Sequence, residues 1–438
     1  MLHRIKKFIP HSWLQGYHFL MANGAALYYR YPSNKIRVIG VTGTNGKSST
    51  VQMIGHLLME LGETVGWTTT ASFRIADREV INSQKMTMLG RTQTHKMMGE
   101  MVKRKCKYAI IETSSQGILQ YRHIGINYDT VLFTNLTPEH IEAHGGFDNY
   151  KATKLRLFQK ITSLKKKRLD GELVPKKIIV NLNDQYSSEF ARFNVDQVIG
   201  YADDDREIYD VHVDKKIVAE KPHLSLAGTA AKIGDEHLKI GLIGPYYLEN
   251  AMAAISTVVS LGFPMRDVLK AGLKLEAVPG RLETFSKDGV TVIVDYAPEP
   301  FALEALYKAV ALFSAKRIIH VTGSTGGGRD TARRKVIGQM SAAKDDVVIV
   351  TNEDPYDEEP MSIIDEIADA AKAYGKVDGE DLFRILDRKE AIEKAISLAG
   401  HGDVVLVTGK GSEPVMAISG GRKVPSDDRV FVRDILGI

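Results

Sequence analysis

The chain has 438 residues, of which 44% are hydrophobic and 26% are charged, and its formal net charge at pH 7 is only +4. This composition is typical of a soluble globular protein with two or three domains, and so small a net charge gives no reason to expect nucleic acid as a partner. The single cysteine, Cys106, excludes an internal disulfide framework and favours the reducing cytoplasm, where we expect the protein to act.

Residues 1–35 are predicted to form a short helical arm. The segment 13–31 is apolar in places, but His18 and Arg30 are among the polar residues that interrupt it. It therefore falls short of the roughly 20 apolar residues that a membrane-spanning helix needs, and we expect no integral span. We favour a helix packed against its own domain. Because basic residues precede it, an amphipathic helix at a membrane surface is the alternative.

Strands and helices alternate from residue 36 onward. Apolar runs predict strands at 36–42, 64–70, 108–112, 130–135 and 178–182, with helices between several of them. This order predicts an α/β fold with a mostly parallel, P-loop-type sheet covered by helices on both faces. Residues 162–177 are predicted to be a solvated basic loop, with contact to a polyanion as the alternative. Residues 200–243 are predicted to form short strands in an antiparallel flap or a small sheet.

A second α/β set follows the turn VPGRLE, residues 278–283. Its predicted strands are 290–297, 317–323, 346–352 and 403–409. We therefore expect an arm at 1–35, a central ATP-binding domain at 36–279 and a second, Rossmann-like domain at 280–438. Tandem α/β domains usually bind ligands in the cleft between them, at the carboxyl ends of their strands.

The stretch VTGTNGKSST, residues 41–50, has the order of strand, glycine turn and helix that a phosphate-binding loop needs. Gly43 and Gly46 allow the backbone to approach a polyphosphate, and the first N–H groups of the helix point at it. Lys47 can reach the β- and γ-phosphates, and the Ser48 hydroxyl can hold Mg²⁺. The general nucleoside-triphosphate motif has another glycine where this chain has Val41. An ordinary glycine turn is the alternative.

Two further strand ends carry candidate metal ligands. Glu112 ends a predicted strand of the same sheet, which is where a carboxylate for Mg²⁺ should lie. Asn135 and His140 follow the next strand, and His140 together with Glu112 makes a plausible second metal site. Lys154 is on the helix that follows, and its spacing alone predicts a solvent-facing side chain.

The second half offers three polar strand ends. Asp295 and Tyr296 follow one strand, where they could hold a base or ribose. The glycine loop 322–328 precedes Arg329, which suits a phosphate or carboxylate. The acidic loop 351–360 suits an amino or cationic group, and a helix start enriched in acids is the alternative.

Taken together, these motifs resemble the Mur ligases, the ATP-dependent amide-bond-forming enzymes of peptidoglycan synthesis. The resemblance covers residues 36–438 and is strongest to the MurE type, which adds the third residue to UDP-N-acetylmuramoyl-L-Ala-D-Glu. The family's phosphate loop, TGTNGK[ST], matches 42–48, so a residue other than glycine at Val41 is expected. ETSSQGILQYR, residues 112–122, and NLTPEH, residues 135–140, match two further family motifs.

The resemblance implies ATP, two Mg²⁺ ions and a reaction through an acyl phosphate. It implies catalytic roles for Lys47, Glu112, His140 and Lys154, with the lysine carbamylated so that it can serve a metal site. It implies metal ligands at Ser48, Glu112, His140 and Lys154. It implies nucleotide contacts at Gly43, Thr44, Asn45, Gly46, Lys47, Ser48, Ser49, Asn250, Arg281, Asp295 and Arg329. It implies substrate contacts at Ser114, Gln120, Arg122 and Asp354. The substrates would be a nucleotide-sugar peptide and an amino acid, and we expect a monomer.

Three positions depart from the family pattern. Pro298 replaces the histidine of DYAH, and Tyr247 replaces the first asparagine of the G-x-x-N-x-x-N motif. Residues 353–356 read EDPY where diaminopimelate-adding members have DNPR, so the added amino acid is left open. The family's uridine-binding front domain is represented only by the arm. The alternatives are therefore a folylpolyglutamate-synthase-like ligase and a nucleotide-binding scaffold without ligase activity.

Overall fold

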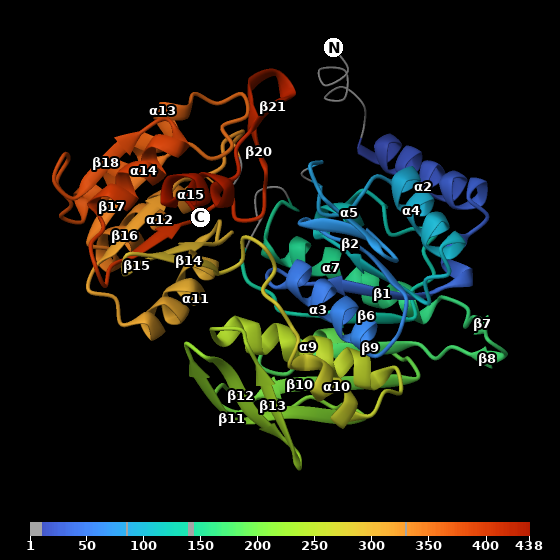
Figure 1. Ribbon diagram of the computed structural model, residues 1–438. Coiled ribbons are helices and arrows are strands. Elements are labelled where there is room, and N and C mark those ends of the chain that lie inside the picture. The colour runs from blue at the N-terminus through green and yellow to red at the C-terminus, as the bar shows by residue number, and fades with distance from the viewer. Residues whose placement is uncertain (1–10, 85, 139–143, 329–330) are drawn as a thin grey trace.

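The computed structural model describes residues 11–84, 86–138, 144–328 and 331–438. Two large sheets dominate it, and Figure 1 shows them in separate halves of the molecule. The larger sheet has eleven strands in the order β13-β12-β11-β10-β9-β6-β1-β5-β2-β3-β4, and the smaller has six in the order β14-β15-β19-β16-β17-β18. Both halves therefore have the α/β class that the alternating sequence predicts.

The strands of the larger sheet are β1 Arg37–Thr42, β2 Val65–Thr68, β3 Ser72–Ile75, β4 Arg78–Ile81, β5 Tyr108–Glu112, β6 Thr130–Phe133, β9 Lys177–Asn181, β10 Gln197–Asp203, β11 Lys215–Ser225, β12 Gly228–Ile233 and β13 Glu236–Ile240. Its helices are α2 His11–Tyr28, α3 Lys47–Glu60, α4 Arg91–Lys103, α5 Ser115–Leu119, α7 Phe147–Thr162, α8 Ser187–Ala191, α9 Pro245–Ser260 and α10 Met265–Gly272. A 3-10 turn, η2 Pro32–Lys35, joins α2 to β1.

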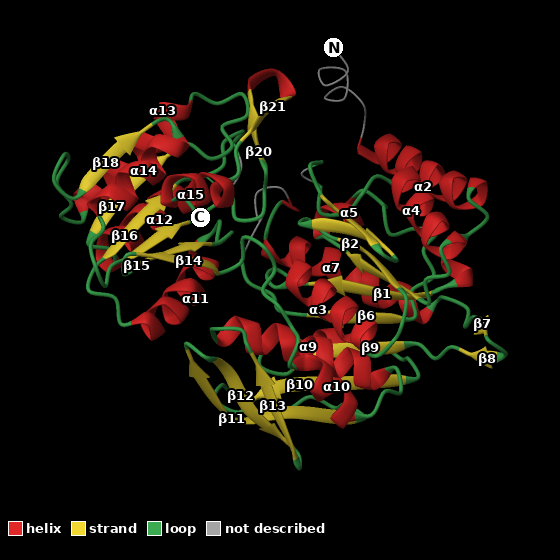
Figure 2. Ribbon diagram, in the orientation of Figure 1, coloured by secondary structure: helices red, strands yellow, loops and turns green. Residues whose placement is uncertain are grey.

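The smaller sheet contains β14 Glu283–Lys287, β15 Val290–Val294, β16 Ile318–Thr322, β17 Val347–Thr351, β18 Leu382–Ile385 and β19 Val404–Val407. Its helices are α11 Pro300–Val310, α12 Ala332–Lys344, α13 Pro360–Ala373, α14 Arg388–Leu398 and α15 Asp428–Leu436 (Figure 2). A hairpin, β20 Val415–Ile418 with β21 Arg422–Pro425, extends from this half, and two short 3-10 turns lie at Ala311–Phe313 and Ser419–Gly421.

The central strands are apolar throughout because the sheet is covered on both faces. Ile39 and Ile110 point into the core under α3 and α9, whereas their neighbours Val38 and Ile111 point into the opposite core under α4 and α7. Strand β1 runs parallel to both of its neighbours, β5 and β6. The carboxyl ends of these three strands therefore meet at one edge, which is where the sequence places its candidate ligands.

Two regional expectations are met only in part. Within residues 200–243, β11, β12 and β13 pair antiparallel as expected, but they join the edge of the large sheet through β10, which runs parallel to β9 and to β11. The basic segment 162–177 is not simply solvated. It holds a small hairpin, β7 Arg168–Leu169 with β8 Glu172–Leu173, and two of its lysines are buried on one carboxylate.

Those two lysines are Lys167 and Lys176, which are 5% and 4% exposed. Their ammonium groups lie 2.5 and 3.1 Å from the carboxylate oxygens of Asp129, which itself accepts a hydrogen bond from the Val38 amide. Burial lowers the pKa of Lys167 to about 8, although Asp129 opposes this shift. Two lysines of this basic segment therefore form a buried ion cluster with Asp129, beside the start of β1.

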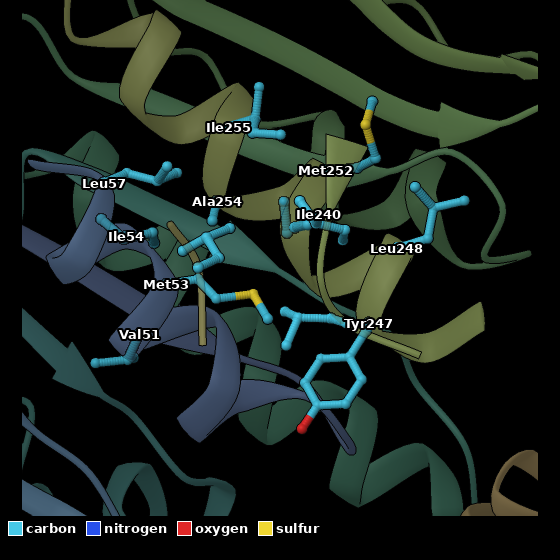
Figure 3. Packing of buried hydrophobic residues seen from close by; sticks show 14 of the residues in the cluster. Val51, Met53, Ile54, Leu57, Ile240, Tyr247, Leu248, Met252, Ala254 and Ile255 are labelled. Carbon is cyan, nitrogen blue, oxygen red and sulfur yellow. The ribbon is translucent and has the colours of Figure 1, made fainter. Parts of the chain in front are cut away.

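Helix α9 braces the helix that follows the glycine loop. Figure 3 shows side chains of α3, such as Met53 and Leu57, in one apolar cluster with side chains of α9, such as Ala254. Burying these side chains fixes α3 and its amino terminus against the sheet. No helix in the described part of the chain is both long and apolar enough to cross a membrane.

Candidate active site

A polar pocket lies where the carboxyl edge of the large sheet faces the second half of the molecule. Its lining residues are Thr44, Asn45, Gly46, Lys47, Ser48, Ser49, Thr70, Thr87, Glu112, Ser114, Ser115, Tyr150, Lys154, Arg281, Tyr296 and Pro298. Eleven of the residues predicted from the sequence are in this group: Thr44, Asn45, Gly46, Lys47, Ser48, Ser49, Glu112, Ser114, Lys154, Arg281 and Tyr296. The lining residues come from both ends of a long stretch of sequence, since Thr44 and Pro298 are more than 200 residues apart.

At Gly43 and Gly46, the glycine loop is packed too tightly for a side chain. Gly46 has a φ of 78°, and a Cβ there would lie 2.1 Å from the Asn250 side-chain oxygen. A Cβ at Gly43 would lie 1.9 Å from the Thr134 hydroxyl. Helix α3 begins immediately after, at Lys47, so its first N–H groups open into the pocket. The Lys47 ammonium is folded back on the loop, 2.5 Å from the Thr44 carbonyl oxygen.

Glu112 and Ser48 form the oxygen pair that the sequence predicts. The Ser48 hydroxyl donates to Glu112 Oε2 at 2.8 Å, and the carboxylate is only 2% exposed. Thr70, which sequence reasoning missed, donates to the same carboxylate from its backbone N–H at 2.7 Å and from its hydroxyl. The available signal was its position just after β2, whose carboxyl end shares this edge. These oxygens are the ligand type that Mg²⁺ prefers.

Lys154 is buried, so the solvent-facing position that its helical spacing predicts is wrong. It is 1% exposed, and its ammonium donates to the Gly43 carbonyl at 2.6 Å. The same ammonium lies 4.5 Å from the centre of the Tyr150 ring, and the Tyr150 hydroxyl is 3.1 Å from that of Thr44. Helix α7 thus directs Lys154 under the phosphate loop.

Arg281 enters the pocket from the turn before β14. Its guanidinium stacks 4.2 Å from the centre of the Tyr296 ring. Asp295 does not line the pocket. Its carboxylate accepts the backbone N–H groups of Leu282 and Ala297, at 2.7 and 2.8 Å, and burial raises its pKa. Asp295 therefore shapes the turn that carries Arg281.

Tyr247 and Asn250 of α9 hold the same region from the central sheet. The Tyr247 hydroxyl donates to the Arg281 carbonyl, so the residue that departs from the family motif ties α9 to the arginine turn. Asn250 accepts from the Thr50 hydroxyl at 3.3 Å and lies against Gly46. Asn250 thus supports the phosphate loop without lining the pocket.

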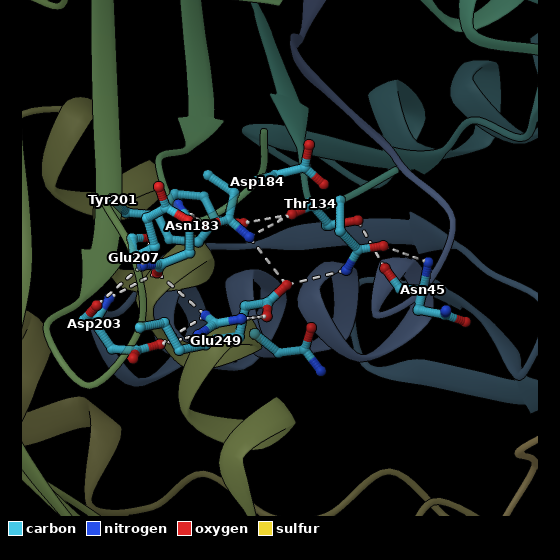
Figure 4. Close-up of polar contacts among 12 residues, drawn as sticks. Asn45, Thr134, Asn183, Asp184, Tyr201, Asp203, Glu207 and Glu249 are labelled. Atoms are coloured by element: carbon cyan, nitrogen blue, oxygen red, sulfur yellow. Dashed lines mark hydrogen bonds and ion pairs between the residues drawn. The ribbon is translucent and has the colours of Figure 1, made fainter. Parts of the chain in front are cut away.

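A polar network extends from the loop toward β9 and β10 (Figure 4). The Asn45 backbone N–H donates to Asn135 Oδ1 at 2.8 Å, and Asn135 Nδ2 donates to Glu249 at 3.0 Å. Arg206 pairs with the other Glu249 oxygen at 2.7 Å. Nearby, burial raises the pKa of Asp184 to about 6. Glu249 and Arg206 carried no recognisable signal in the sequence, because they come from a helix interior and a turn.

The predicted substrate contacts divide into two groups. Ser114 lines the pocket, where its hydroxyl accepts from the Gly117 N–H at 3.1 Å and caps α5. Arg122 donates to the side chain of Gln120 at 2.6 Å and to the Met88 carbonyl. Burial, reinforced by the charge of Arg91, lowers the pKa of Arg122. Gln120 and Arg122 are therefore paired with each other beside the pocket.

Asp354 lies at the carboxyl edge of the smaller sheet. It is 5% exposed, accepts the Ala417 backbone N–H at 2.8 Å and lies 3.5 Å from the Lys410 ammonium. Its neighbour Glu353 accepts the Thr325 hydroxyl at 2.7 Å, while its other carboxylate oxygen is buried without a hydrogen-bond partner among the described residues. Glu353 and Asp354 of the acidic loop are thus buried.

Two predicted residues, His140 and Arg329, lie outside the described residues. Within the ranges that the structure describes, no group of three or more His, Cys, Asp and Glu side chains could hold a metal ion. The second metal site therefore stays a prediction.

Comparison with known proteins gives one consistent result. The profile of the Mur ligase middle domain matches residues 41–258, and that of the Mur ligase glutamate ligase domain matches 280–411. A UDP-N-acetylmuramyl-tripeptide synthetase of Borreliella afzelii is 35% identical over 400 residues, covering 90% of this chain and 75% of the relative. The UDP-N-acetylmuramoyl-L-alanyl-D-glutamate–2,6-diaminopimelate ligase of Aquifex aeolicus is 32% identical, covering 95% and 81%.

Solved structures give the same fold. A UDP-N-acetylmuramoyl-L-alanyl-D-glutamate–2,6-diaminopimelate ligase superimposes with a TM-score of 0.58 at 26% identity, covering 92% of this chain and 78% of that one. A folylpolyglutamate synthase of Mycobacterium tuberculosis, complexed with ADP and AMPPCP, gives a TM-score of 0.68 at 16% identity and covers 96% and 95%. At that identity the second likeness concerns the fold alone.

Proposed function

The chain belongs to the Mur ligase family, and from this premise we propose how its own residues carry out the reaction. It is an ATP-dependent ligase of peptidoglycan precursor synthesis, and its relatives include tripeptide synthetases and diaminopimelate ligases. The observation that carries the proposal is the meeting of Ser48, Glu112, Lys154 and Arg281 in one pocket at the start of α3. The hydroxyl of the glycine loop, the carboxylate, the lysine and the arginine thus line the same pocket.

The pocket suits a nucleoside triphosphate with its metal ions. Gly43 and Gly46 leave no room for a Cβ at their own positions, so the backbone of the loop can come close to phosphate oxygens there. We propose that one Mg²⁺ is held by Ser48 and Glu112, and a second by Glu112, His140 and carbamylated Lys154. Bound there, Mg²⁺ would neutralise charge on the phosphates and on the acceptor carboxylate.

The reaction then needs mainly positioning and charge stabilisation from the protein. The acceptor carboxylate attacks the γ-phosphorus of ATP and the bond from that phosphorus to the β–γ bridging oxygen breaks, which releases ADP and forms an acyl phosphate. An amine attacks the acyl carbon, and inorganic phosphate leaves as the nitrogen loses a proton. Lys47 and Arg281 stabilise the developing phosphate charge from the two sides of the pocket. Asn45, Ser49 and Arg329 complete the contacts to ATP.

We assign the acceptor to the Ser114 side of the pocket and the amine to the Asp354 side. Ser114, Gln120 and Arg122 lie on the loop and helix that follow Glu112. Asp354 and its neighbours present buried carboxylates at the edge of the second sheet, which suits an amino group. Tyr356 stands where an arginine for a second carboxylate would be, which favours an amino acid with one carboxylate over diaminopimelate.

The test is a substrate matrix. The purified chain would be incubated with ATP, Mg²⁺ and UDP-N-acetylmuramoyl-L-Ala-D-Glu, together with each candidate amino acid, and the product identified by mass spectrometry. We expect ADP release that requires both acceptor and amine, together with a nucleotide-linked tripeptide. If diaminopimelate were the one amino acid that gave a product, the preference for a single carboxylate inferred from Tyr356 would be contradicted.

The folylpolyglutamate synthase likeness supplies a second arm of the same experiment. That structure is matched over 95% of its own length, more than the muramoyl ligase structure. Folate with glutamate would therefore be tested in parallel. Ligation of glutamate to folate, with none to the muramoyl dipeptide, would replace the proposed acceptor. ADP release that never depends on an amine would instead indicate a nucleotide-binding protein without ligase activity.

A further inference from the structure

Helix α2 presents an apolar stripe to solvent. Residues Tyr17, Leu20, Met21, Leu27 and Tyr28, called here the outer stripe, recur at the three- and four-residue spacing of one helix face. Leu20 is 71% exposed, Leu27 64% and Tyr28 79%. In the described part of the chain nothing covers them. Large apolar side chains clustered on one exposed face indicate a surface that binds something.

The opposite face of α2 is already used. Ala22, Ala25 and Ala26 are buried, and α2 packs through this small-residue face beside α4. Ala26 lies close to Gly125, where an added Cβ would be 2.5 Å from it. The helix is thus apolar on two sides, of which its own domain buries only one. An ordinary surface helix is polar on its outer face. Because the outer stripe stays exposed in the folded chain, its apolar side chains do not add to the buried core.

Charge distinguishes among the possible partners of this face. Residues 1–35 contain five of the chain's 58 Lys and Arg residues and none of its 54 Asp and Glu residues. The remaining 403 residues hold 53 basic and 54 acidic side chains, so the whole positive excess of the chain lies in the arm. The adjacent α4 and the turn after it add exposed Lys96, Arg104 and Lys105, while Lys103 pairs with Glu100 of the same helix. The complement of this region is an anionic surface.

We propose that α2 docks the enzyme on an anionic lipid surface, lying in the interface through its outer stripe. An amphipathic helix binds such a surface when apolar and aromatic side chains enter the headgroup boundary and basic groups face anionic lipids. Tyr17 and Tyr28 supply rings with a polar tip, which suit that boundary. Figure 1 shows α2 at the far edge of the molecule from the second half, so docking there leaves the pocket between the halves open. A second copy of the chain would carry the same positive charge and is disfavoured.

The experiment is vesicle flotation with the full chain. Vesicles of phosphatidylcholine alone are compared with vesicles that contain phosphatidylglycerol as well. We expect the chain to float with the anionic vesicles, to stay behind with the neutral ones and to be released as salt is raised. The double variant Leu20→Glu with Leu27→Glu should lose binding by about tenfold or more, because each glutamate removes apolar area and adds repulsion.

A matched control carries the same changes elsewhere. Leu226 and Leu273 are 52% and 58% exposed outside the arm, so the double variant Leu226→Glu with Leu273→Glu should float like the parent chain. Both double variants should keep the parent's melting temperature and its ATP turnover without vesicles. The proposal is overturned if the parent chain does not float, if the control loses binding equally, or if the arm variant instead abolishes a dimer seen by light scattering.

Discussion

Lys154 is held under the phosphate loop by the Gly43 carbonyl and the Tyr150 ring. As an ammonium it can only donate; as a carbamate it would offer oxygens toward Glu112. We therefore expect Lys154→Ala to lower turnover by about 100-fold or more, and short-chain carboxylic acids added to the assay to restore part of it. The measurement is ADP release with saturating substrates.

A lysine on the same helix provides the control. Lys151 pairs with Glu189 at 2.7 Å outside the pocket, so Lys151→Ala should turn over normally with or without added acid. If Lys154→Ala turned over like the parent chain, the carbamate assignment would be dropped. If its loss were not rescued, Lys154 would act as a cation at this position.

A second residue-level effect concerns acid stability. His95 is fully buried beneath α2, and burial lowers its pKa to about 4 from the ordinary value of 6.5. The unfolded chain therefore binds more protons than the folded one between these values, so the free energy of unfolding falls as pH is lowered through this window. From about pH 7 to about pH 5, we expect His95 to account for a loss of roughly 2 kcal/mol.

Replacing the histidine should remove this dependence. His95→Leu should lose about 2 kcal/mol less unfolding free energy than the parent over that range, measured by urea unfolding followed by circular dichroism. The same change at Thr92, an exposed position of α4 that does not titrate, should leave the pH dependence unaltered. Equal slopes for the parent and His95→Leu would show that the imidazole is charged in the folded protein.

The predicted residues that the structure does bring together share one property: their position follows from a strand end or a glycine turn. Ser48 and Glu112 meet because β1 and β5 are adjacent and parallel. Lys154 and Lys167 were placed wrongly, because helical spacing and local charge do not reveal which lysine finds a buried partner. Glu249 was missed for the same reason, since its contacts come from segments distant in sequence.

At the scale of one element, the glycine loop cannot accept a side chain at Gly46, for two separate reasons. A residue at Gly46 would be strained by its φ of 78° and would collide with Asn250 of α9. We expect Gly46→Ala to weaken ATP binding by about tenfold or more, measured by calorimetry, because the loop must move away from α9. Gly62 provides the control, since its φ is 85° but a Cβ there meets nothing within 4 Å.

Gly62→Ala should therefore cost only the backbone term, about 1 kcal/mol of unfolding free energy, and leave ATP affinity unchanged. Equal losses of affinity in the two variants would mean that the collision with Asn250 has no role. The comparison separates conformational strain from packing at the phosphate site.

Elements were predictable where burial imposes a continuous apolar run. Strands β1, β5, β16, β17 and β19 are fully covered or nearly so, and their sequences show it. Strands β14 and β18 lie at the edges of their sheet and were missed, because their sequences are mixed in polarity. The antiparallel strands β11–β13 were recognised as strands in part, but alternation alone does not say which sheet they join.

At the scale of the whole molecule, the candidate site takes lining residues from both halves, with Arg281, Tyr296 and Pro298 from the second. The sequence indicated two α/β units and a cleft between them, but nothing in it gave the contacts across that cleft. One such contact joins the phosphate loop to the second half: Asn45 Nδ2 donates to Glu299 Oε1 at 3.0 Å. Glu299 also caps α11 by accepting the N–H groups of Phe301 and Ala302, at 3.0 and 3.1 Å.

Because Glu299 is bonded to both halves, we expect it to couple ATP binding to their alignment. Glu299→Ala should lower kcat/KM for ATP by about tenfold, the loss of one charge-assisted hydrogen bond, and should also cost about 1 kcal/mol of stability through the lost cap. Glu359 caps α13 through the Ser362 N–H at 2.8 Å and belongs to the second half alone, so Glu359→Ala isolates the effect of losing a cap. Steady-state kinetics of both variants decide the matter. Equal activity in the two would show that the halves align without Glu299. A loss in Glu299→Ala alone, abolished in an Asn45→Ala background, would place the coupling in this single bond between the loop and the second sheet.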